Sequence, residues 1–409
     1  LADQHIEKLV IMGLTDTPNA NRLHITLFGR RNSGKSSLIN ALTGQDIALV
    51  SNTPGTTTDL VSKAMEIQGI GPCLFIDTPG FDDEGELGEL RISRTLKAIE
   101  KTDIALLLCE DTTFFHEKEI LALLKEKNIP VIPVLNKIDI RENSDHLATY
   151  IEEQCKIPPL LISAKEKIGI ELIRQAILEK LPSDFGQQNI TGKLVAENDL
   201  VLLVMPQDIQ APKGRLILPQ VQTIRELLDK KCLVMTCTTD KFSATLQALA
   251  RPPKLIITDS QVFKAIYEQK PKESELTSFS VLFAGYKGDI HYYVESAAVI
   301  ERLTESSRVL IAEACTHAPL SEDIGRVKLP RLLRKRIGEN LQIDMVAGTD
   351  FPQDLTPYSL VIHCGACMFN RKYVLSRIER AREQHIPMTN YGVAIAFLNG
   401  ILDLSLIHI

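Results

Sequence analysis

The run from Gly29 to Ser36 has the residue types of a phosphate-binding loop, with two glycines separated by four residues and followed by Lys and Ser. It follows an apolar run and opens a helical pattern, which is the context such a loop requires. Its glycines let backbone N–H groups surround phosphate oxygens, and the helix N-terminus adds a positive dipole end. We expect Lys35 to bridge the β- and γ-phosphates and the Ser36 hydroxyl to bind Mg2+. The predicted nucleotide-binding residues of this loop are Gly29, Asn32, Ser33, Gly34, Lys35, Ser36 and Ser37.

Three further motifs follow short apolar runs downstream. In the segment Asp77–Gly80, the acid can hold the Mg2+ shell and the Gly80 N–H can reach the γ-phosphate. The Asp139 carboxylate can accept two N–H bonds from guanine, whereas adenine would leave its charge facing an acceptor. The sequence therefore predicts GTP as the nucleotide. The predicted base-side residues are Asn136, Lys137, Asp139, Ser163, Ala164 and Lys165.

A second group of residues has the spacing of a metal site, Cys315-x-His317 and later His363-Cys364-x-x-Cys367. A Cys-x-x-Cys pair presents two thiolates to one metal centre from a tight loop. Zinc would need four closed ligands, with His317 completing the three cysteines, whereas an iron–sulfur cluster fits three thiolates and an exchangeable fourth ligand. The candidates for that fourth position are His317, His363, Glu305 and Glu313. Either histidine is alternatively a neighbour that only hydrogen-bonds to the site.

Apolar runs and helical patterns alternate along almost the whole chain, which is typical of parallel sheets covered by helices. The predicted fold is α/β, with a P-loop GTPase domain followed by two smaller α/β domains with mostly parallel sheets. Cys315 and Cys364 each follow a predicted strand, so they are expected to converge at one sheet edge. The predicted strands are 23–28, 73–76, 104–108, 131–135, 160–162, 200–205, 232–236, 255–258, 308–314, 342–347 and 359–363, and the predicted helices include 35–43, 171–180, 220–230, 243–250, 290–303 and 371–383.

Polar stretches mark the expected domain limits. Met12 is a candidate native start, which would make residues 1–11 foreign to the natural chain. The apolar run 281–285 opens the last predicted unit, and the apolar tail 391–409 is expected to form a buried helix. The predicted parts are an N-terminal segment 1–22, the GTPase domain 23–181, a linker 182–190, a middle domain 191–267 and a C-terminal domain 268–409.

Composition narrows the class of protein. The chain has 409 residues, 46 Lys and Arg against 52 Asp and Glu, and a net charge of −6, which argues against a protein that coats nucleic acid. Its apolar runs are far shorter than the roughly 18 residues of a membrane span. Eight scattered cysteines do not form a secreted disulfide scaffold, so the expected location is the reducing cytoplasm. One dense basic stretch, 326–336, is a solvated helix face, a docking surface for anionic cargo or an acidic partner, or an RNA-binding surface, and the overall acidity argues against the last.

The order of the nucleotide motifs resembles a translation-factor-type GTPase domain. Between them, Thr53–Asp59 resembles the first switch of the Era, EngA and MnmE family, which implies that Thr57 is the Mg2+ and γ-phosphate ligand. Thr56 is the adjacent alternative, because three threonines follow one another. Phe81 follows Gly80 where a Ras-like enzyme has a water-orienting glutamine. Related GTPases use an asparagine at the position of Asn32 to help bind K+, which implies slow, K+-stimulated hydrolysis. The residues expected to take part in catalysis are Lys35, Ser36, Thr57, Asp77 and Gly80.

The GTPase domain, the middle α/β unit and the cysteine pattern together resemble the HydF family of FeFe-hydrogenase maturation GTPases. The likeness also includes residues 19–22 and 211–220. It implies a 4Fe–4S cluster on Cys315, Cys364 and Cys367, and a scaffold that passes a diiron subcluster precursor to apo-FeFe-hydrogenase. It further implies homodimerisation through the middle domain and the radical-SAM maturases HydE and HydG as partners. The alternative is a ribosome-assembly or tRNA-modifying GTPase with structural zinc.

Overall fold

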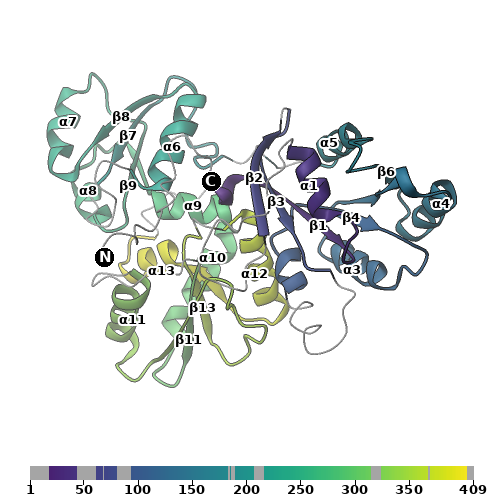
Figure 1. The fold of residues 1–409 in the computed structure, drawn as a ribbon. Coiled ribbons are helices and arrows are strands. Elements are labelled where there is room, and N and C mark those ends of the chain that lie inside the picture. The colour runs from purple at the N-terminus through teal and green to yellow at the C-terminus, as the bar shows by residue number, and fades with distance from the viewer. Residues whose placement is uncertain are drawn as a thin grey trace, which may run out of the picture. The chain divides into compact units, whose positions relative to one another are not determined.

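The computed structural model describes residues 18–43, 61–67, 69–80, 94–182, 185, 189–206, 216–314, 324–366 and 369–402 (Figure 1). The chain divides into two compact units, Leu1–Pro182 and Ser183–Ile409, and each is considered by itself. Among the helices that the structure describes, none has the length and apolar character needed to cross a membrane.

The first unit is built on a six-stranded sheet with the strand order β2-β3-β1-β4-β5-β6. Only β2 runs antiparallel to its neighbour; the other pairs are parallel. Strands β1, β4 and β5 are buried along their whole length, which is why they read as continuous apolar runs. The elements are β1 (Leu23–Gly29), α1 (Lys35–Thr43), β2 (Val61–Ile67), β3 (Gly71–Asp77), β4 (Ile104–Cys109), α3 (Phe115–Glu126), β5 (Val131–Leu135), α4 (Ser144–Cys155), β6 (Leu160–Leu161) and α5 (Ile170–Glu179).

The second unit contains two four-stranded sheets, β10-β9-β7-β8 and β12-β11-β13-β14. Every pair in both sheets is parallel, so the predicted α/β class is confirmed for both. The elements of the first sheet region are β7 (Leu200–Val204), α6 (Leu218–Asp229), β8 (Leu233–Cys237), α7 (Phe242–Ala248), β9 (Leu255–Thr258), α8 (Phe263–Gln269), β10 (Glu275–Ser278) and α9 (Phe279–Lys287). Those of the second are α10 (Ile290–Ala297), β11 (Arg308–Glu313), α11 (Leu329–Ile337), β12 (Gln342–Ala347), β13 (Leu360–His363), α12 (Arg371–Glu383), β14 (Met388–Asn390) and α13 (Tyr391–Leu398).

The middle sheet extends further along the chain than the sequence predicted. Strand β10 pairs with β9, so the sheet continues past the expected limit at Tyr267. The polar character of the segment around Pro271 indicated a domain boundary, because a short strand with polar residues at a sheet edge has little apolar signal. The next apolar run, 281–285, lies inside helix α9, whose N-cap Ser278 accepts a hydrogen bond from the Val281 N–H.

Helix α9 is the element that the two sheet regions share. It packs against α6 on one side and against α10, α12 and α13 of the following region. One buried core contains Leu202 and Ile256 from the first sheet together with Leu310 and Val361 from the second. The two sheets of the second unit are therefore parts of one packed body.

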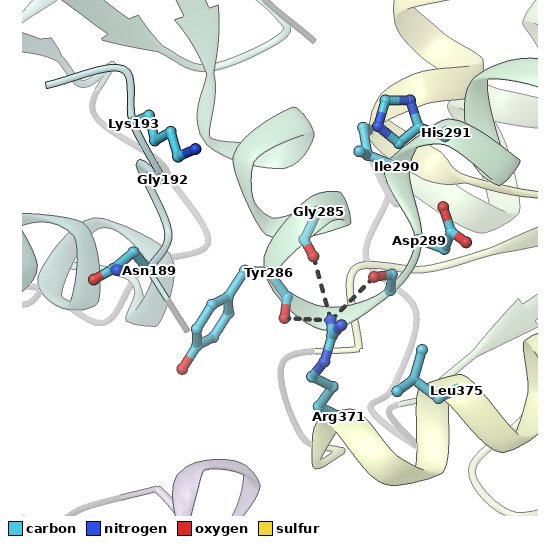
Figure 2. Close-up of a pocket in the computed structure, with 11 residues that line it drawn as sticks. Asn189, Gly192, Lys193, Gly285, Tyr286, Asp289, Ile290, His291, Arg371 and Leu375 are labelled. Atoms are coloured by element: carbon cyan, nitrogen blue, oxygen red, sulfur yellow. Dashed lines mark hydrogen bonds between the residues drawn. The ribbon is translucent and has the colours of Figure 1, made fainter. Parts of the chain in front are cut away.

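Arg371, the first residue of α12, fixes this helix to the end of α9. Its Nη1 donates to the carbonyl oxygens of Gly285, Tyr286 and Gly288 at 3.3, 2.9 and 3.0 Å (Figure 2). These bonds satisfy carbonyls that a helix C-terminus leaves without intrahelical partners. A cavity of about 650 Å3 opens beside this contact, and its polar lining includes Lys193, Asp289 and His291.

Candidate functional site

The predicted phosphate loop lies between the carboxyl end of β1 and the first turn of α1. Gly34 has a φ of +89°, and a Cβ at this position would come within 2.2 Å of Asn136 Nδ2. The position therefore requires glycine. Asn32 also has a left-handed backbone, with a φ of 63°, which asparagine tolerates better than most residues. Left-handed residues of this kind curve a backbone so that successive N–H groups can face an anion.

Lys35 is held against its own loop. The side chain is 7% exposed, and its Nζ donates to the carbonyl oxygens of Gly29 at 2.8 Å and Arg30 at 2.7 Å. Those two bonds place a buried cation inside the loop that the sequence predicts for the β- and γ-phosphates.

Ser36 and Asp77 meet at the carboxyl ends of β1 and β3. Ser36 Oγ donates to Asp77 Oδ2 at 2.6 Å, and Asp77 Oδ1 is buried without a hydrogen-bond partner. Burial raises the pKa of Asp77, while the Ser36 hydroxyl and the Lys35 charge act in the opposite direction. A hydroxyl beside a carboxylate oxygen that lacks a partner is a donor set that Mg2+ accepts, so these residues fit the predicted ion.

Asn136 connects the phosphate loop to the base-side loop. Its Nδ2 donates to the Ser33 carbonyl at 3.0 Å, and its Oδ1 accepts the Ala164 N–H at 3.0 Å. The side chain is 3% exposed, so both bonds lie in the interior. Two predicted motifs that are more than a hundred residues apart are thus joined by one side chain.

The other base-side residues remain accessible. The Asp139 side chain is exposed, and a hydrogen bond from the Ser163 hydroxyl is the main reason why the pKa of Asp139 is lowered. The carboxylate is therefore ionised and open to a guanine base. Lys137 has a left-handed backbone and forms an ion pair with Glu110 at 3.0 Å. Lys165 is exposed next to Glu166.

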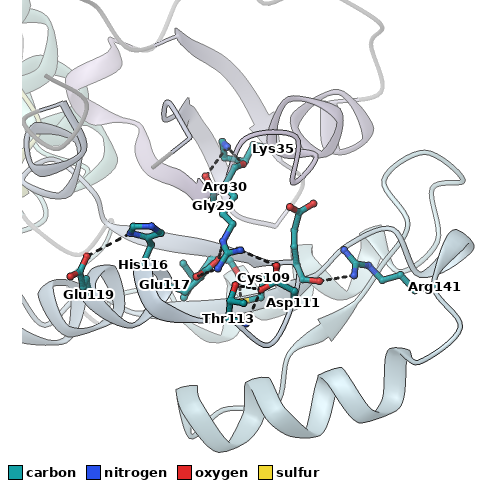
Figure 3. Close-up of polar contacts among 12 residues, drawn as sticks. Gly29, Arg30, Lys35, Cys109, Asp111, Thr113, His116, Glu117, Glu119 and Arg141 are labelled. Carbon is teal, nitrogen blue, oxygen red and sulfur yellow. Dashed lines mark hydrogen bonds and ion pairs between the residues drawn. The ribbon is translucent and has the colours of Figure 1, made fainter. Parts of the chain in front are cut away.

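An ion-pair group behind the phosphate loop was not predicted. Arg30 pairs with Asp111 through Nη1 and with Glu117 through Nε, each at 2.9 Å (Figure 3). Glu117 lies in the first turn of α3 and is 1% exposed. In the sequence, an acid in a helix first turn looks like an ordinary solvated residue. Arg141 also reaches this region and donates to the Glu110 carbonyl at 2.6 Å.

Part of the predicted nucleotide site falls outside the residues that the structure describes. This part includes Thr57, the rest of the predicted first switch and Phe81. Gly80 and Ser37 are described, and Ser37 is exposed on the first turn of α1. The site that can be described is therefore the phosphate loop, the Ser36–Asp77 pair and the base-side loops.

The second candidate site begins where β11 and β13 end. These strands are adjacent and parallel, as the sequence predicted, with Ala312 opposite His363. Cys364 Sγ accepts the N–H of Ala314 at 3.0 Å and that of Ala366 at 3.4 Å. Backbone N–H groups that point at a sulfur stabilise its thiolate form, which is the form that binds metal.

His363 has both ring nitrogens engaged. Nδ1 donates to the Cys364 carbonyl at 2.8 Å, and Nε2 accepts from Arg377 Nη1 at 2.8 Å. The imidazole is 0% exposed, and burial together with the Arg377 charge lowers the pKa of His363 to about 3. A neutral ring with no open nitrogen favours the alternative in which His363 positions the cysteine loop and does not bind metal.

The acidic candidates for the fourth ligand differ in position. Glu305 precedes β11 and accepts from Asn340 Nδ2 at 3.0 Å, so it lies at the opposite end of the strand from the cysteine loop. Glu313 is the last residue of β11 and pairs with Arg326 at 3.4 Å. Cys315, His317 and Cys367 have no described position. Within the described ranges, no group of three His, Cys, Asp or Glu residues could hold a metal ion.

The basic stretch forms the exposed face of α11. Leu329 and Leu333 point into the core, while Arg331, Lys335 and Arg336 are exposed. This pattern is that of a solvated amphipathic helix.

Three family models match successive parts of the chain. Residues 24–137 match the 50S ribosome-binding GTPase model, residues 190–288 the hydrogen maturase F dimerization domain, and residues 291–408 the hydrogen maturase F tetramerization domain. The nucleotide motifs and the GTPase model thus coincide in the first unit.

Curated relatives with similar sequences are also GTPases, and the two described below each match less than half of this chain. The tRNA modification GTPase MnmE of Nitrosomonas europaea is 38% identical over 174 residues, which is 42% of this chain and 37% of that protein. GTPase Der of Wolinella succinogenes is 34% identical over 208 residues, or 47% of this chain and 43% of that protein. The chain therefore spans only 37% and 43% of the length of these two relatives.

Solved structures with some likeness are also GTP-binding proteins. A probable GTP-binding protein EngB is 26% identical with a TM-score of 0.31, and it covers 38% of this chain and 97% of that one. A crystal structure of Aquifex aeolicus Era bound to GDP and AlF4− is 20% identical with a TM-score of 0.33, covering 53% of this chain and 92% of that one.

Together, the sheet order, the nucleotide motifs and the GTPase model define a GTPase that carries two additional α/β domains. The two additional domains match models specific to one family, in the expected order. The chain belongs to the hydrogen maturase F family. The two models are described as a dimerization and a tetramerization domain, which supports oligomerisation of the chain.

Proposed function

We propose that this chain is a GTP-hydrolysing scaffold of FeFe-hydrogenase maturation. It would hold a 4Fe–4S cluster on Cys315, Cys364 and Cys367 and carry a diiron subcluster precursor to apo-hydrogenase. The observation that supports the cluster site best is the 3.0 Å contact between the Ala314 N–H and the Cys364 sulfur. Ala314 is the residue before Cys315 in the sequence, so the described contact is one residue away from the first cysteine along the chain.

The fourth ligand in this proposal is exchangeable. His363 is engaged at both ring nitrogens, so we assign it to holding the loop. His317 and Glu313 remain the candidates, and Glu313 already ends the strand that leads to Cys315. When it is bound, the cluster would supply an iron whose labile ligand an incoming cyanide of the diiron unit can replace.

GTP would act as a timer in this cycle. Lys35 and Ser36 would bind the phosphates and Mg2+, and Asp139 would bind guanine. Binding of the γ-phosphate orders the switch segments of such domains, and hydrolysis releases them. The segment after Asp77 is one of those switches, and its change would alter contacts with partners. The partners proposed are HydE, HydG and apo-hydrogenase.

Hydrolysis is proposed to be K+-stimulated. The exposed, left-handed Asn32 stands where related GTPases bind K+. Rates of GTP hydrolysis in KCl and NaCl at equal ionic strength test this point, and equal rates in the two salts would contradict it.

Strand β8 is the proposed dimer contact. It is an edge strand of the sheet that matches the dimerization model, and Leu233 and Met235 are 51% and 39% exposed on it. An edge strand with apolar side chains and unpaired backbone groups is a template for pairing with a second copy.

Metal analysis after anaerobic purification tests the central proposal. We expect brown protein with iron and sulfide in equal amounts, and loss of both in Cys364→Ser and Cys367→Ser. Cys237→Ser is the matched control, because Cys237 is a partly buried free cysteine in the middle sheet. Colourless protein with stoichiometric zinc and RNA binding would instead support the ribosome-assembly or tRNA-modifying alternative.

A further inference from the structure

Arg377 is the largest fully buried side chain in the part of the chain that the structure describes. It lies on α12 and is 1% exposed. No described Asp or Glu lies within ion-pair distance of its guanidinium, whereas the exposed Arg382 on the same helix pairs with Asp289 at 2.6 Å. A buried charge without a partner of opposite sign is costly, so this cation requires an explanation.

Aromatic rings and neutral acceptors surround the guanidinium. Its central carbon lies 4.7 Å from the ring centroids of Phe351, Phe369 and Tyr373. Nη2 donates to the Gly348 carbonyl at 2.7 Å, and Nε is buried without a hydrogen-bond partner. Cation–π contacts and carbonyl dipoles stabilise the charge but do not neutralise it.

The same guanidinium is connected to the cysteine loop. Nη1 donates to His363 Nε2, and His363 Nδ1 donates to the Cys364 carbonyl, each at 2.8 Å. Phe369, which comes two residues after Cys367 in the sequence, has its ring centroid 4.7 Å from the central carbon of the same guanidinium. Lys287, 4% exposed, donates to the Phe369 carbonyl at 3.2 Å. Two buried cations thus contact the segments that enter and leave the Cys364–Cys367 loop.

We propose that Arg377 is the buried counter-charge of an anionic metal cluster held by the cysteine loop, and that it positions this loop through His363. The proposal rests on the cluster-binding function proposed above. A 4Fe–4S core with three thiolates is negatively charged and becomes more negative on reduction. A nearby fixed cation in a low-dielectric interior therefore stabilises the bound cluster, and stabilises its reduced form most.

The test compares Arg377→Met, which removes the charge, with Arg377→Lys, which retains it. Both are reconstituted as the full-length protein with iron and sulfide, and Arg382→Gln is the control for loss of an exposed charge from the same helix. For Arg377→Met we expect a shift of the cluster midpoint potential to lower values in an electrochemical titration followed by EPR. We also expect roughly 10- to 100-fold faster loss of iron to a chelator, the range for loss of a residue that supports metal ligands. Arg377→Lys should remain closer to the wild type in both measurements.

A purely structural role predicts a different result. In that case Arg377→Met and Arg377→Lys would both retain the wild-type midpoint potential and differ from the wild type only in folding stability. That result would overturn the proposed role of Arg377 as a counter-charge. If Arg377→Met does not fold, the double variant Arg377→Met/His363→Leu removes both partners of the buried contact and leaves neither unsatisfied. It should show the same lowered potential, and a wild-type value would again overturn the proposal. A wild-type protein that binds no cluster would overturn the proposed function and this inference together.

Discussion

Replacement of Asn136 by alanine should destabilise the GTPase unit where the phosphate loop contacts the base-side loop. The substitution deletes the donor to the Ser33 carbonyl and the acceptor of the Ala164 N–H, both at 3.0 Å. Because the side chain is 3% exposed, the two backbone groups would remain in the interior without their partners. Asn136→Ala therefore tests whether this one amide connects the phosphate loop with the base-side loop.

The expected magnitude follows from the two orphaned groups. Leaving a buried polar group unsatisfied costs about 1–3 kcal/mol, so two such groups predict a loss of roughly 2–6 kcal/mol in the free energy of unfolding of this unit. Because about 1.4 kcal/mol corresponds to a tenfold change in the unfolding equilibrium constant, this loss would raise that constant more than tenfold. Nucleotide affinity should fall as well, because both loops that Asn136 connects contribute to the predicted site.

Hydrogen exchange read by mass spectrometry is the appropriate assay. The chain has no tryptophan, and its two units need not unfold together, so a single optical signal would not isolate this region. Peptides that cover residues 131–165 would report the lower free energy of unfolding directly, as faster amide exchange. Asn143→Ala is the matched control, since Asn143 is exposed and its side chain makes no capping bond. A change of less than about 0.5 kcal/mol in Asn136→Ala, similar to that of a surface substitution, would refute the reasoning.

Three further predictions concern other parts of the molecule. Burial raises the pKa of Asp77 above 3.8, so the folded nucleotide-free unit should lose stability as pH rises from that value to the folded pKa. Asp77→Asn should then raise the unfolding temperature at pH 7, by about 2–4 °C for each 1 kcal/mol gained in the free energy of unfolding, and calorimetry would show this. The same substitution should weaken Mg2+-dependent GTP binding in a nucleotide titration. Asp139→Asn should lower GTP affinity roughly 10- to 100-fold and leave folding unchanged, and an unaltered affinity would exclude the assigned role in guanine recognition. Leu233→Lys on β8 should reduce the oligomeric state in sedimentation, whereas Leu172→Lys, an equally exposed site on α5, should not.

Much of the fold could be predicted because parallel strands buried on both faces give continuous apolar runs. Strands β5, β9 and β12 have the bounds that the sequence predicted, and so does helix α12. The misses have physical causes. The edge strand β10 is largely buried but contains Thr277 and Ser278, so it leaves no apolar pattern, and the short apolar run in α9 fits a strand as well as a helix.

The nucleotide site was predictable in its motifs but not in its connections. Glycine, lysine and acid spacing identified the loops, whereas the Arg30–Glu117 pair and the two bonds of Asn136 depend on which distant side chains the fold brings together. The burial of Arg377 could not be predicted from the sequence for a related reason. It lies on a helix with three other arginines, Arg371, Arg380 and Arg382, none of which is buried, so its sequence context gives no sign of burial, and only the tertiary structure shows that it faces inward.

The core common to the two sheets of the second unit has a consequence for assembly. Leu202 and Ile256 pack in the same core as Leu310 and Val361, and Cys237 of β8 and Cys364 of the cysteine loop contact this core. Strand β8 and Cys364 therefore belong to one packed body. Copies joined through β8 would hold their cysteine loops at a constant spacing, independent of any hinge. Under the proposed function, the distance between the cysteine loops of two copies would be set when the oligomer forms, and nucleotide turnover would govern only which partner binds and for how long.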